Sequence, residues 1–373
     1  MLNKRVVKNF FSKLDYVLIA MTVVLAAFGL LVIYSATRSL DSGFRQMLVQ
    51  TLAMVLGIIF MFVLASIDYE NYTDYVKYIY AGSIAVLVFV LIFGEGKEET
   101  GANSWIRIAG IGVQPSELVK IAFAITFSTH LAKVKDDINS FKVICGLFLH
   151  FAILAGLVII QNDTGTALVF LFMFLMMLFV AGISYKYVFI AAGGLAAMLP
   201  LVWFLLADYQ KNRILVFLNP ERDAKGAGFQ VLQSKIAIGS GGFMGRGYLQ
   251  GPQNQLAMLP EKDTDFIYGV VGEEFGFIGA VLVLFLLLLI IIRCIYIAQK
   301  AKNDMGSYIC IGVAAMFTFH TFENICMCIG LMPVTGIPLP FVSYGGSSVA
   351  TNFMAVGLVL SVWSRRRVIN FGT

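Results

Sequence analysis

Residues 259–293 read LPEKDTDFIYGVVGEEFGFIGAVLVLFLLLLIIIR, a charged cluster that leads directly into a long apolar segment. Charge at the edge of such a segment is ordinary, but Glu273 and Glu274 follow about two turns inside it, where carboxylates are energetically expensive. The apolar part is long enough to cross a bilayer as a helix, which needs roughly 20 residues. The pattern therefore predicts a membrane-spanning helix with acidic residues near its start. Acids in this position indicate a role in catalysis or transport.

Composition places the whole chain in the same class. Hydrophobic residues make up 59% and charged residues 13%, against the ~25% charged residues of soluble proteins. Outward from 266–293, apolar segments predict ten transmembrane helices in all, at 15–36, 47–67, 76–94, 115–132, 142–160, 166–183, 185–207, 266–293, 306–330 and 346–363. We expect an all-α polytopic membrane protein with a single membrane domain, 1–373, and a large extracytoplasmic loop, 208–264, between the seventh and eighth helices.

The orientation follows from lysine and arginine in the short loops, which favour the cytoplasmic side. Ten helices bring one set of basic residues to the same side, and both termini are therefore expected in the cytoplasm; the set includes Lys4, Arg5, Lys133, Lys135, Lys186, Arg293, Lys300, Arg365 and Arg366. Asp68, Glu70 and Asp74 lie on that side too, but acids weigh little in this rule. The net charge of +5 reflects this topology and predicts no nucleic-acid partner.

Several common functions lack their sequence signature. The glycine-rich run 239–247, GSGGFMGRG, has Met244 where a dinucleotide-binding pattern needs glycine, and no Walker A motif is present. We expect a tight turn with close backbone approach there, which argues against ATP-driven work. Cys326 and Cys328 lack zinc or redox spacing, and the three histidines are scattered, so no metal motif is recognised.

The predicted fourth helix opens with QPSELVK, residues 114–120. Glu117 and Lys120 are three residues apart and share one helix face, so they can pair with each other. Burying such a pair in lipid is expensive unless protein or water surrounds it. Two interpretations stay open: an ion pair that holds neighbouring helices, or a polar wall that faces a cavity.

Two further polar residues allow two interpretations each. Arg107, in NSWIR at 103–107, could hold either a lipid phosphate or the phosphate of a substrate. Asp163, in QNDTGT at 161–166, could cap the next helix or line a water-filled cavity, since Gly165 permits non-helical backbone.

The segment 333–348, PVTGIPLPFVSYGGSS, contains three prolines and cannot be one continuous helix. We expect a polar loop that contains Ser343 and ends at the tenth helix, with Ser347 or Ser348 as its cap. A helix start that faces an outer cavity can bind anions, although a plain connection explains the segment as well. Asp265 can likewise be an ordinary helix cap. Glu323, near His320, is expected to be a hydrogen-bonded interior acid.

Together these segments resemble the SEDS family of shape, elongation, division and sporulation proteins, such as RodA, FtsW and SpoVE. The resemblance covers almost the whole chain and rests on NSWIR, QPSELVK, QNDTGTA, FLNPERDAKGAGFQVLQSKIAIGSGG, GPQNQLAMLPEKDTDFIYGVVGEEFGFIG and MPVTGIPLPFVSYGGSS, in that order. The QSKIAIGSGG and GPQNQ stretches are closer to RodA. The chain departs from the family at Asn162, where proline is usual, and at Asp263, where histidine is frequent.

The resemblance implies a peptidoglycan glycosyltransferase that polymerises lipid II into glycan strands during cell elongation, on the outer face of the bacterial cytoplasmic (inner) membrane. It implies a class B penicillin-binding protein, a transpeptidase, as partner, together with other elongation-complex membrane proteins. The family's essential aspartate maps onto Asp265, and its charged pair maps onto Glu117 and Lys120.

The chemistry of such a reaction fits these residue types. A sugar hydroxyl is a poor nucleophile, and a positioned carboxylate that takes its proton contributes ~10²–10⁴-fold. Asp265 is the predicted catalytic base, and the leaving pyrophosphate needs cations from the protein or a divalent ion, Mg or Mn. The predicted substrate-binding residues are Arg107, Glu117, Lys120, Asp163, Lys235, Glu261, Lys262 and Ser343; Arg213 and Arg246 are further outer cations.

We expect Glu117, Lys120 and Asp265 to line one outward-facing cavity. Two rival hypotheses remain: a lipid II flippase or transporter, and a non-catalytic membrane scaffold for a transpeptidase. The polar motifs gather on one side of the membrane and no inverted repeat is evident, which favours one-sided chemistry over transport.

Overall fold

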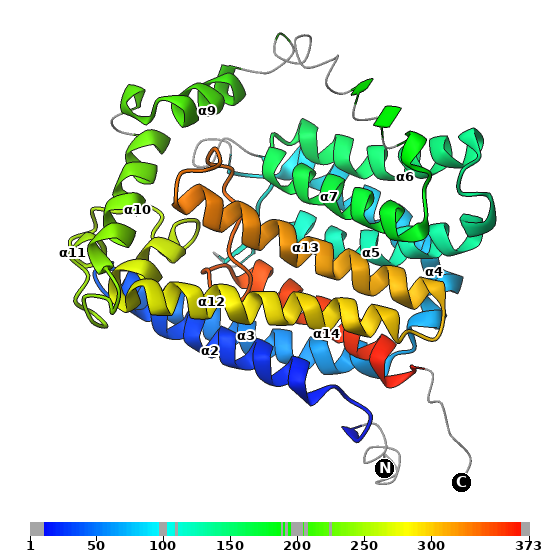
Figure 1. Cartoon of the computed structure of the whole chain (residues 1–373), viewed down its shortest axis with the longest axis horizontal. Coiled ribbons are helices and arrows are strands. Elements are labelled where there is room, and N and C mark those ends of the chain that lie inside the picture. The colour runs from blue at the N-terminus through cyan, green and yellow to red at the C-terminus, as the bar shows by residue number, and fades with distance from the viewer. Residues whose placement is uncertain are drawn as a thin grey trace.

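Long α-helices run side by side through the molecule and leave their ends, loops and one short hairpin at the two edges of the bundle (Figure 1). The structure, a computed structural model, describes residues 11–96, 103–108, 111–187, 189–190, 193–194, 204, 208–223 and 226–366. The long helices are α2 (Tyr16–Thr37), α3 (Gly43–Ser66), α4 (Tyr72–Phe93), α5 (Pro115–Val134), α6 (Phe141–Ile160), α7 (Thr164–Ala181), α12 (Ile267–Gln299), α13 (Asp304–Cys328) and α14 (Gly346–Ser364).

Polar residues at the helix starts explain several of these boundaries. The side chains of Asp15, Asp163 and Asn303 each accept a hydrogen bond from a backbone N–H in the first turn of α2, α7 and α13. Pro115 occupies the first turn of α5, where no N–H is needed. Gly182 ends α7 in a left-handed conformation, with φ of 90°.

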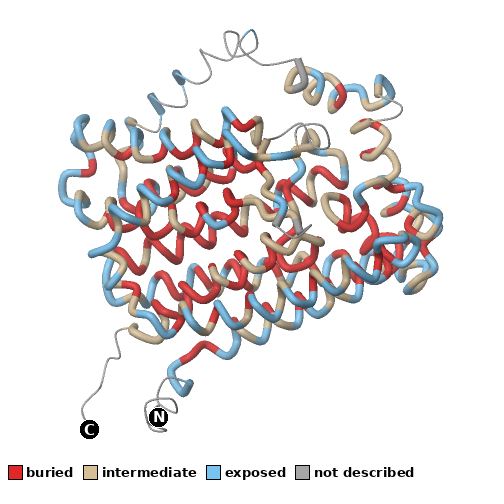
Figure 2. Tube along the Cα trace, turned by 180° about the vertical axis from the view of Figure 1, so that it is seen from behind, coloured by how far each residue is buried: buried red, intermediate tan, exposed pale blue. Residues whose placement is uncertain are grey.

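The helices divide into a buried centre and an exposed shell (Figure 2). In α13 and α14, 78% and 72% of the apolar window is buried, whereas for α3 the value is 17%. α13 packs against α5, α7 and α12, and α14 lies against α3. The exposed apolar residues of the outer helices therefore form the surface that a bilayer would cover.

Eight helices in the described part of the chain are long and apolar enough to cross a membrane. They correspond to eight of the ten predicted spans, so the all-α polytopic class is confirmed. The predicted fourth span forms α5, which has 20 residues but is more polar than these eight. Most of the predicted seventh span, 185–207, lies outside the described residues.

Ion pairs join the helices at the end of the bundle where α2 begins and α14 ends. Arg293 of α12 lies 2.8 Å from Asp15, Arg365 lies 3.0 Å from Asp68, and Lys302 lies 3.1 Å from Glu70. Asp68 and Glu70, two of the three acids on this side, are thus partners of basic residues from other segments.

The segment 208–264 is ordered where the structure describes it. It contains α9 (Asp208–Leu218), the 3₁₀ turn η3 (Pro220–Arg222), α10 (Ala227–Gly241) and α11 (Pro252–Gln255), and α10 packs against α12. Gly241 meets the backbone of Gly272 so closely that a Cβ would clash, and Gly276, with φ of 66°, kinks α12 against Gly245. The predicted close backbone approach of the glycine-rich run is confirmed.

Candidate active site

Asp265 lies half-buried in the wall of a polar cleft with a volume of about 330 Å³. The lining residues come from the segment before α12, from α9 and α10, and from the loop between α13 and α14; they include Trp105, Gln114, Asp163, Arg213, Gln230, Glu261, Asp265, Thr335, Tyr344 and Ser348. A second hollow of about 290 Å³ adjoins it and shares Trp105, Thr264, Tyr344 and Gly345. The cleft and the second hollow therefore lie next to each other and share part of their walls.

Three helices start at the cleft. Gln114, Asp163 and Gly345, the residues that immediately precede α5, α7 and α14, all line it. Helix starts carry partial positive charge and unpaired N–H groups, which favour a bound anion. The expectation of a helix start at the cleft is confirmed for the tenth predicted span, although Gly345 occupies the cap position instead of Ser347 or Ser348.

The backbone around Asp265 is held at three successive carbonyls. The carbonyl of Asp263 accepts a hydrogen bond from the Tyr344 N–H (2.7 Å), and that of Thr264 accepts one from the Ser343 hydroxyl (2.6 Å). The carbonyl of Asp265 accepts one from Asn324 Nδ2 (2.8 Å). These bonds come from α13 and from residues 330–345 of the loop between α13 and α14 (the 330–345 loop), so Asp265 is positioned by segments distant in the chain.

One face of α13 in turn holds the 330–345 loop. His320 Nδ1 lies 3.1 Å from the Pro338 carbonyl, and Asn324 Nδ2 donates to the Ile337 carbonyl at 2.8 Å. Glu323, between them on the same helix, accepts a hydrogen bond from the Thr335 hydroxyl. Residues three and four apart share a helix face, which explains how one turn of α13 reaches three loop positions.

Acid neighbours and burial determine the proton affinity of Asp265. Burial, with added repulsion from Glu261 and Asp263, raises the pKa of Asp265 from 3.8 to about 7, and Arg213 acts in the opposite direction. A carboxyl group with a pKa near neutrality can accept a proton and release it again, which is the property that a general base requires.

Glu117 and Lys120 form an ion pair at 2.8 Å, with side-chain exposures of 3% and 1%. Lys120 Nζ also lies 2.8 Å from His320 Nε2. Because the ammonium can only donate, Nε2 is the acceptor and Nδ1–H donates to Pro338. The pair thus supports Pro338 in the cleft wall from behind. The expectation that these two residues line the cavity is wrong, because both are buried and neither is among the residues that line the cleft.

Among the other predicted binding residues, Asp163 and Glu261 line the cleft. Asp163 caps α7 and also accepts a hydrogen bond from Gln114 Nε2 at 2.7 Å, so both interpretations of this residue hold. Arg107 lies on the hairpin of β1 (Ile106–Ile108) and β2 (Ile111–Val113), 3.7 Å from Glu95, and Lys235 is exposed on α10 against Gly330. Neither belongs to the lining of the cleft.

Lys262 and Ser343 are buried and point into the protein instead of into the cleft. Lys262 Nζ donates to the Ser39 hydroxyl at 2.8 Å and to the Asn254 carbonyl, and burial lowers the pKa of its ammonium. Ser343 accepts a hydrogen bond from the Leu339 N–H at 2.8 Å in addition to its bond to Thr264. Both therefore position the segment that carries Asp265.

Gln230, Thr335 and Tyr344 line the cleft and were not singled out from the sequence. For Thr335 and Tyr344 a signal existed, because both belong to the proline-rich segment that was expected to form a polar loop. Gln230 carries no such signal, since it occurs within an amphipathic helix.

The described residues contain no group of three or more histidine, cysteine, aspartate or glutamate side chains that could hold a metal ion. The acidic residues that line the cleft are Asp163, Glu261 and Asp265.

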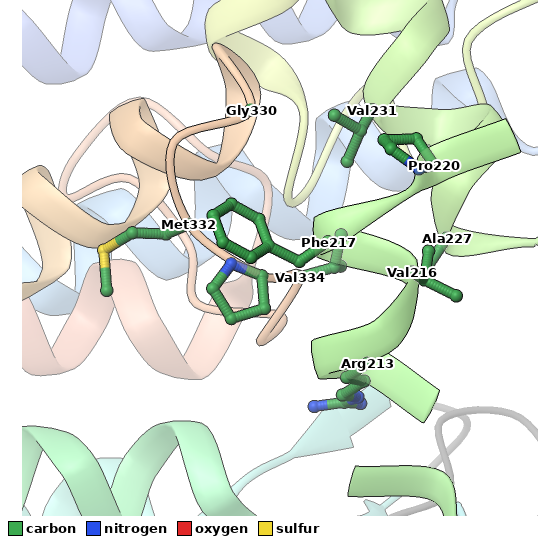
Figure 3. Close-up of a pocket in the computed structure, with 10 residues that line it drawn as sticks. Arg213, Val216, Phe217, Pro220, Ala227, Val231, Gly330, Met332 and Val334 are labelled. Carbon is green, nitrogen blue, oxygen red and sulfur yellow. The ribbon is translucent and has the colours of Figure 1, made fainter. Parts of the chain in front are cut away.

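Arg213 lines both the polar cleft and an adjoining apolar pocket (Figure 3). That pocket is lined by Phe217 of α9, Val231 of α10, and Met332 and Val334 of the 330–345 loop. A cation thus lies where the polar cleft meets a small apolar pocket.

The model of the cell cycle protein family FtsW/RodA/SpoVE matches residues 15–368. The chain belongs to this family. It is 36% identical to the peptidoglycan glycosyltransferase MrdB of Escherichia coli K12, over 97% of each chain, and 35% identical to the "Probable peptidoglycan glycosyltransferase FtsW" of Geobacter metallireducens, over 95% of this chain and 96% of that one. By these relatives the chain is a bacterial multi-pass membrane protein and a peptidoglycan glycosyltransferase.

Solved structures share the fold. A chain in a structure described as "Structural coordination of polymerization and crosslinking by a peptidoglycan synthase complex" aligns with a TM-score of 0.81 and 31% identity, over 94% of this chain and 97% of that one. The rod shape determining protein RodA of Thermus thermophilus aligns with a TM-score of 0.69 and 25% identity, over 95% and 97%.

Proposed function

We propose that this protein polymerises lipid II into glycan strands, with Asp265 as the general base. The observation that carries the proposal is a single arrangement: a carboxyl group with a pKa near 7 lies half-buried in a polar cleft on which three helix starts converge. Such a cleft can hold a sugar linked to an anionic pyrophosphate and can remove a proton from a hydroxyl group.

In the proposed step, the hydroxyl of an acceptor sugar attacks the anomeric carbon of the donor sugar. The new glycosidic C–O bond forms as the bond from that carbon to the pyrophosphate oxygen breaks, with inversion at the carbon. The hydroxyl proton passes to Asp265, and polyprenyl pyrophosphate leaves with the bonding electrons. Asp265 then returns its proton to solvent, which a pKa near 7 allows.

The leaving group needs positive charge, since pyrophosphate departs readily once its charge is matched. Arg213 and the starts of α5, α7 and α14 supply that charge at the cleft. A divalent ion, Mg or Mn, that arrives with the pyrophosphate remains part of the proposal.

The basic loops support a finer placement of the reaction. On the predicted topology of ten helices with cytoplasmic termini, Asp265 faces the extracytoplasmic side of the cytoplasmic membrane, where a finished glycan strand is needed. A class B penicillin-binding protein is the proposed partner, because a related chain occurs in a complex described as coordinating polymerisation and crosslinking.

A role in cell elongation is proposed on the QSKIAIGSGG and GPQNQ stretches, since relatives called FtsW and MrdB match at nearly the same identity. Expression in cells depleted of RodA, and separately in cells depleted of FtsW, tests this role. We expect rod shape to return in the first strain; restored division in the second strain alone would assign the protein to division.

The activity itself is tested by reconstituting the purified protein in vesicles with fluorescent lipid II, with and without the transpeptidase and with and without a chelator. We expect glycan strands on a gel. Movement of lipid II across the bilayer without polymer would favour the flippase, and binding of the transpeptidase without either activity would favour the scaffold.

A further inference from the structure

Glu323 is a fully buried acid, at 0% exposure, close to the C-terminal end of α13 at Cys328. One of its carboxylate oxygens accepts a hydrogen bond from the Thr335 hydroxyl. The other, Oε2, has no hydrogen-bond partner in the part of the chain that the structure describes. An acid inside a membrane-spanning helix that leaves half of its hydrogen-bonding capacity unused is expensive, and such residues are functional candidates by default.

Thr335, the partner of Glu323, lines the cleft beside the catalytic carboxylate. It precedes Gly336, where an added Cβ would lie 3.4 Å from Oδ2 of Asp265. Asn324, next to Glu323 on α13, donates to the Asp265 carbonyl. The same turn of α13 thus holds the backbone of the base and, through Glu323, the hydroxyl beside it.

The direction of the hydrogen bond decides what Thr335 can offer to a substrate. A threonine hydroxyl has one proton and two lone pairs, and Thr335 is the donor in its hydrogen bond to Oε1 of Glu323. With its proton directed to Glu323, the hydroxyl presents lone pairs to the cleft and acts there as an acceptor. A substrate group bound by Thr335 must therefore be a donor.

That donor is distinct from the attacking hydroxyl, whose single proton goes to Asp265. We propose that Glu323 is a positioning residue: it orients the Thr335 hydroxyl so that this hydroxyl accepts a hydrogen bond from a second donor of the acceptor sugar, a neighbouring hydroxyl or amide N–H. Two fixed contacts, one to each residue, align the attacking oxygen. This inference rests on the proposed polymerisation reaction.

A merely structural bond between α13 and the loop is the competing explanation. The loop is already joined to α13 by His320 at Pro338 and by Asn324 at Ile337. A structural role predicts that loss of the bond lowers thermal stability. A positioning role predicts that it lowers kcat/KM for polymerisation while the thermal midpoint stays near that of the unmutated protein.

The test is a double-mutant cycle in the reconstituted full-length protein with lipid II. We expect Thr335→Val and Glu323→Leu each to lower kcat/KM by roughly 10- to 100-fold, and the double variant to be no slower than the slower single variant. Thr335→Ser, which keeps the hydroxyl, should restore most of the rate. Thr318→Val is the matched control, since that hydroxyl bonds to the Ala314 carbonyl of its own helix.

Two results would overturn the inference. One is a Thr335→Val protein with unchanged kcat/KM. The other is a double variant whose loss is the product of the two single losses, because Glu323 would then act independently of Thr335. Absence of glycan strands from the unmutated protein is a different outcome, and it would reject the proposed function itself.

Discussion

The buried pair of Lys120 and Glu117 allows the sharpest prediction on stability. At 2.8 Å and with side-chain exposures of 1% and 3%, each charge depends on the other for neutralisation. Lys120→Met would leave the Glu117 carboxylate without a cation in the bundle, and its Oε2 already has no hydrogen-bond partner among the described residues. Breaking a buried pair in this way typically costs about 3–5 kcal/mol.

The double variant Glu117→Leu/Lys120→Met removes both charges and fills the space with apolar side chains of similar length. Such replacements are often neutral or stabilising. His320 Nε2 would lose its donor in this variant, which costs about 1 kcal/mol. We therefore expect the double variant to unfold within about 2 kcal/mol of the unmutated protein, far from the sum of the two single losses.

The assay is equilibrium unfolding in detergent micelles for the unmutated protein, both single variants and the double variant, with polymerisation measured on the same preparations. Because the pair lies behind the cleft wall, the double variant should also polymerise faster than either single variant. Additive losses of stability, or single variants as stable as the unmutated protein, would refute the reasoning about burial.

Other consequences concern the segment that carries the base. Asn324→Leu removes two hydrogen bonds of 2.8 Å and should lower unfolding free energy by about 1–3 kcal/mol and kcat by about 10²-fold; a loss of stability alone would contradict the positioning. Lys262→Met removes the bonds to Ser39 and the Asn254 carbonyl and should lower the thermal midpoint, with KM for lipid II unchanged. Polymerisation should rise with pH through about 7 and then level off, because only ionised Asp265 accepts a proton and burial raises its pKa to about 7; a flat profile would contradict this. The same raised pKa stabilises the folded state fully below the ordinary value of 3.8, and that stability is lost as pH rises to about 7. Asp265→Asn should therefore have a higher thermal midpoint than the unmutated protein above pH 7, and the difference should vanish near pH 4.

The helices were predictable because their signals are local. Apolar length determines where a span lies, and residues such as Asp15 and Asp163 start helices through contacts within one turn. α12 runs to Gln299, six residues past the predicted end. Arg293, where the span was expected to end, pairs with Asp15, a residue distant in the chain that the local pattern does not identify.

The roles of individual charges depended on distant partners. Glu273 and Glu274 suggested chemistry near the mouth of a helix, yet Glu273 accepts hydrogen bonds from the backbone of Gln253 and Asn254, and Glu274 accepts one from Ser35. These acids hold the GPQNQ segment onto α12 and α2. The residues next to Glu273 and Glu274 in the sequence do not indicate that Gln253, Asn254 and Ser35 are their hydrogen-bond donors.

The direction of each side chain in the segment before α12, residues 261–265, was also not predictable. Glu261 and Asp265 line the cleft, whereas Lys262 and Asp263, between them, are buried on the other side. Glu261 has φ of 48°, so the segment is an irregular turn without the period of a helix or strand. Because the backbone has no regular repeat, the sequence indicated that this segment matters but did not predict which side chains point into the cleft.

The two neighbouring aspartates provide the most direct test of the account. Asp263 is buried and bonded to Gln46 Nε2 at 3.0 Å, whereas Asp265 lines the cleft. Polymerisation of lipid II should be measured side by side for Asp265→Asn and Asp263→Asn, both checked for folding. We predict a loss of ~10²–10⁴-fold for Asp265→Asn and a much smaller loss for Asp263→Asn. Glycan strands made at the unmutated rate by Asp265→Asn would contradict the assignment of the base.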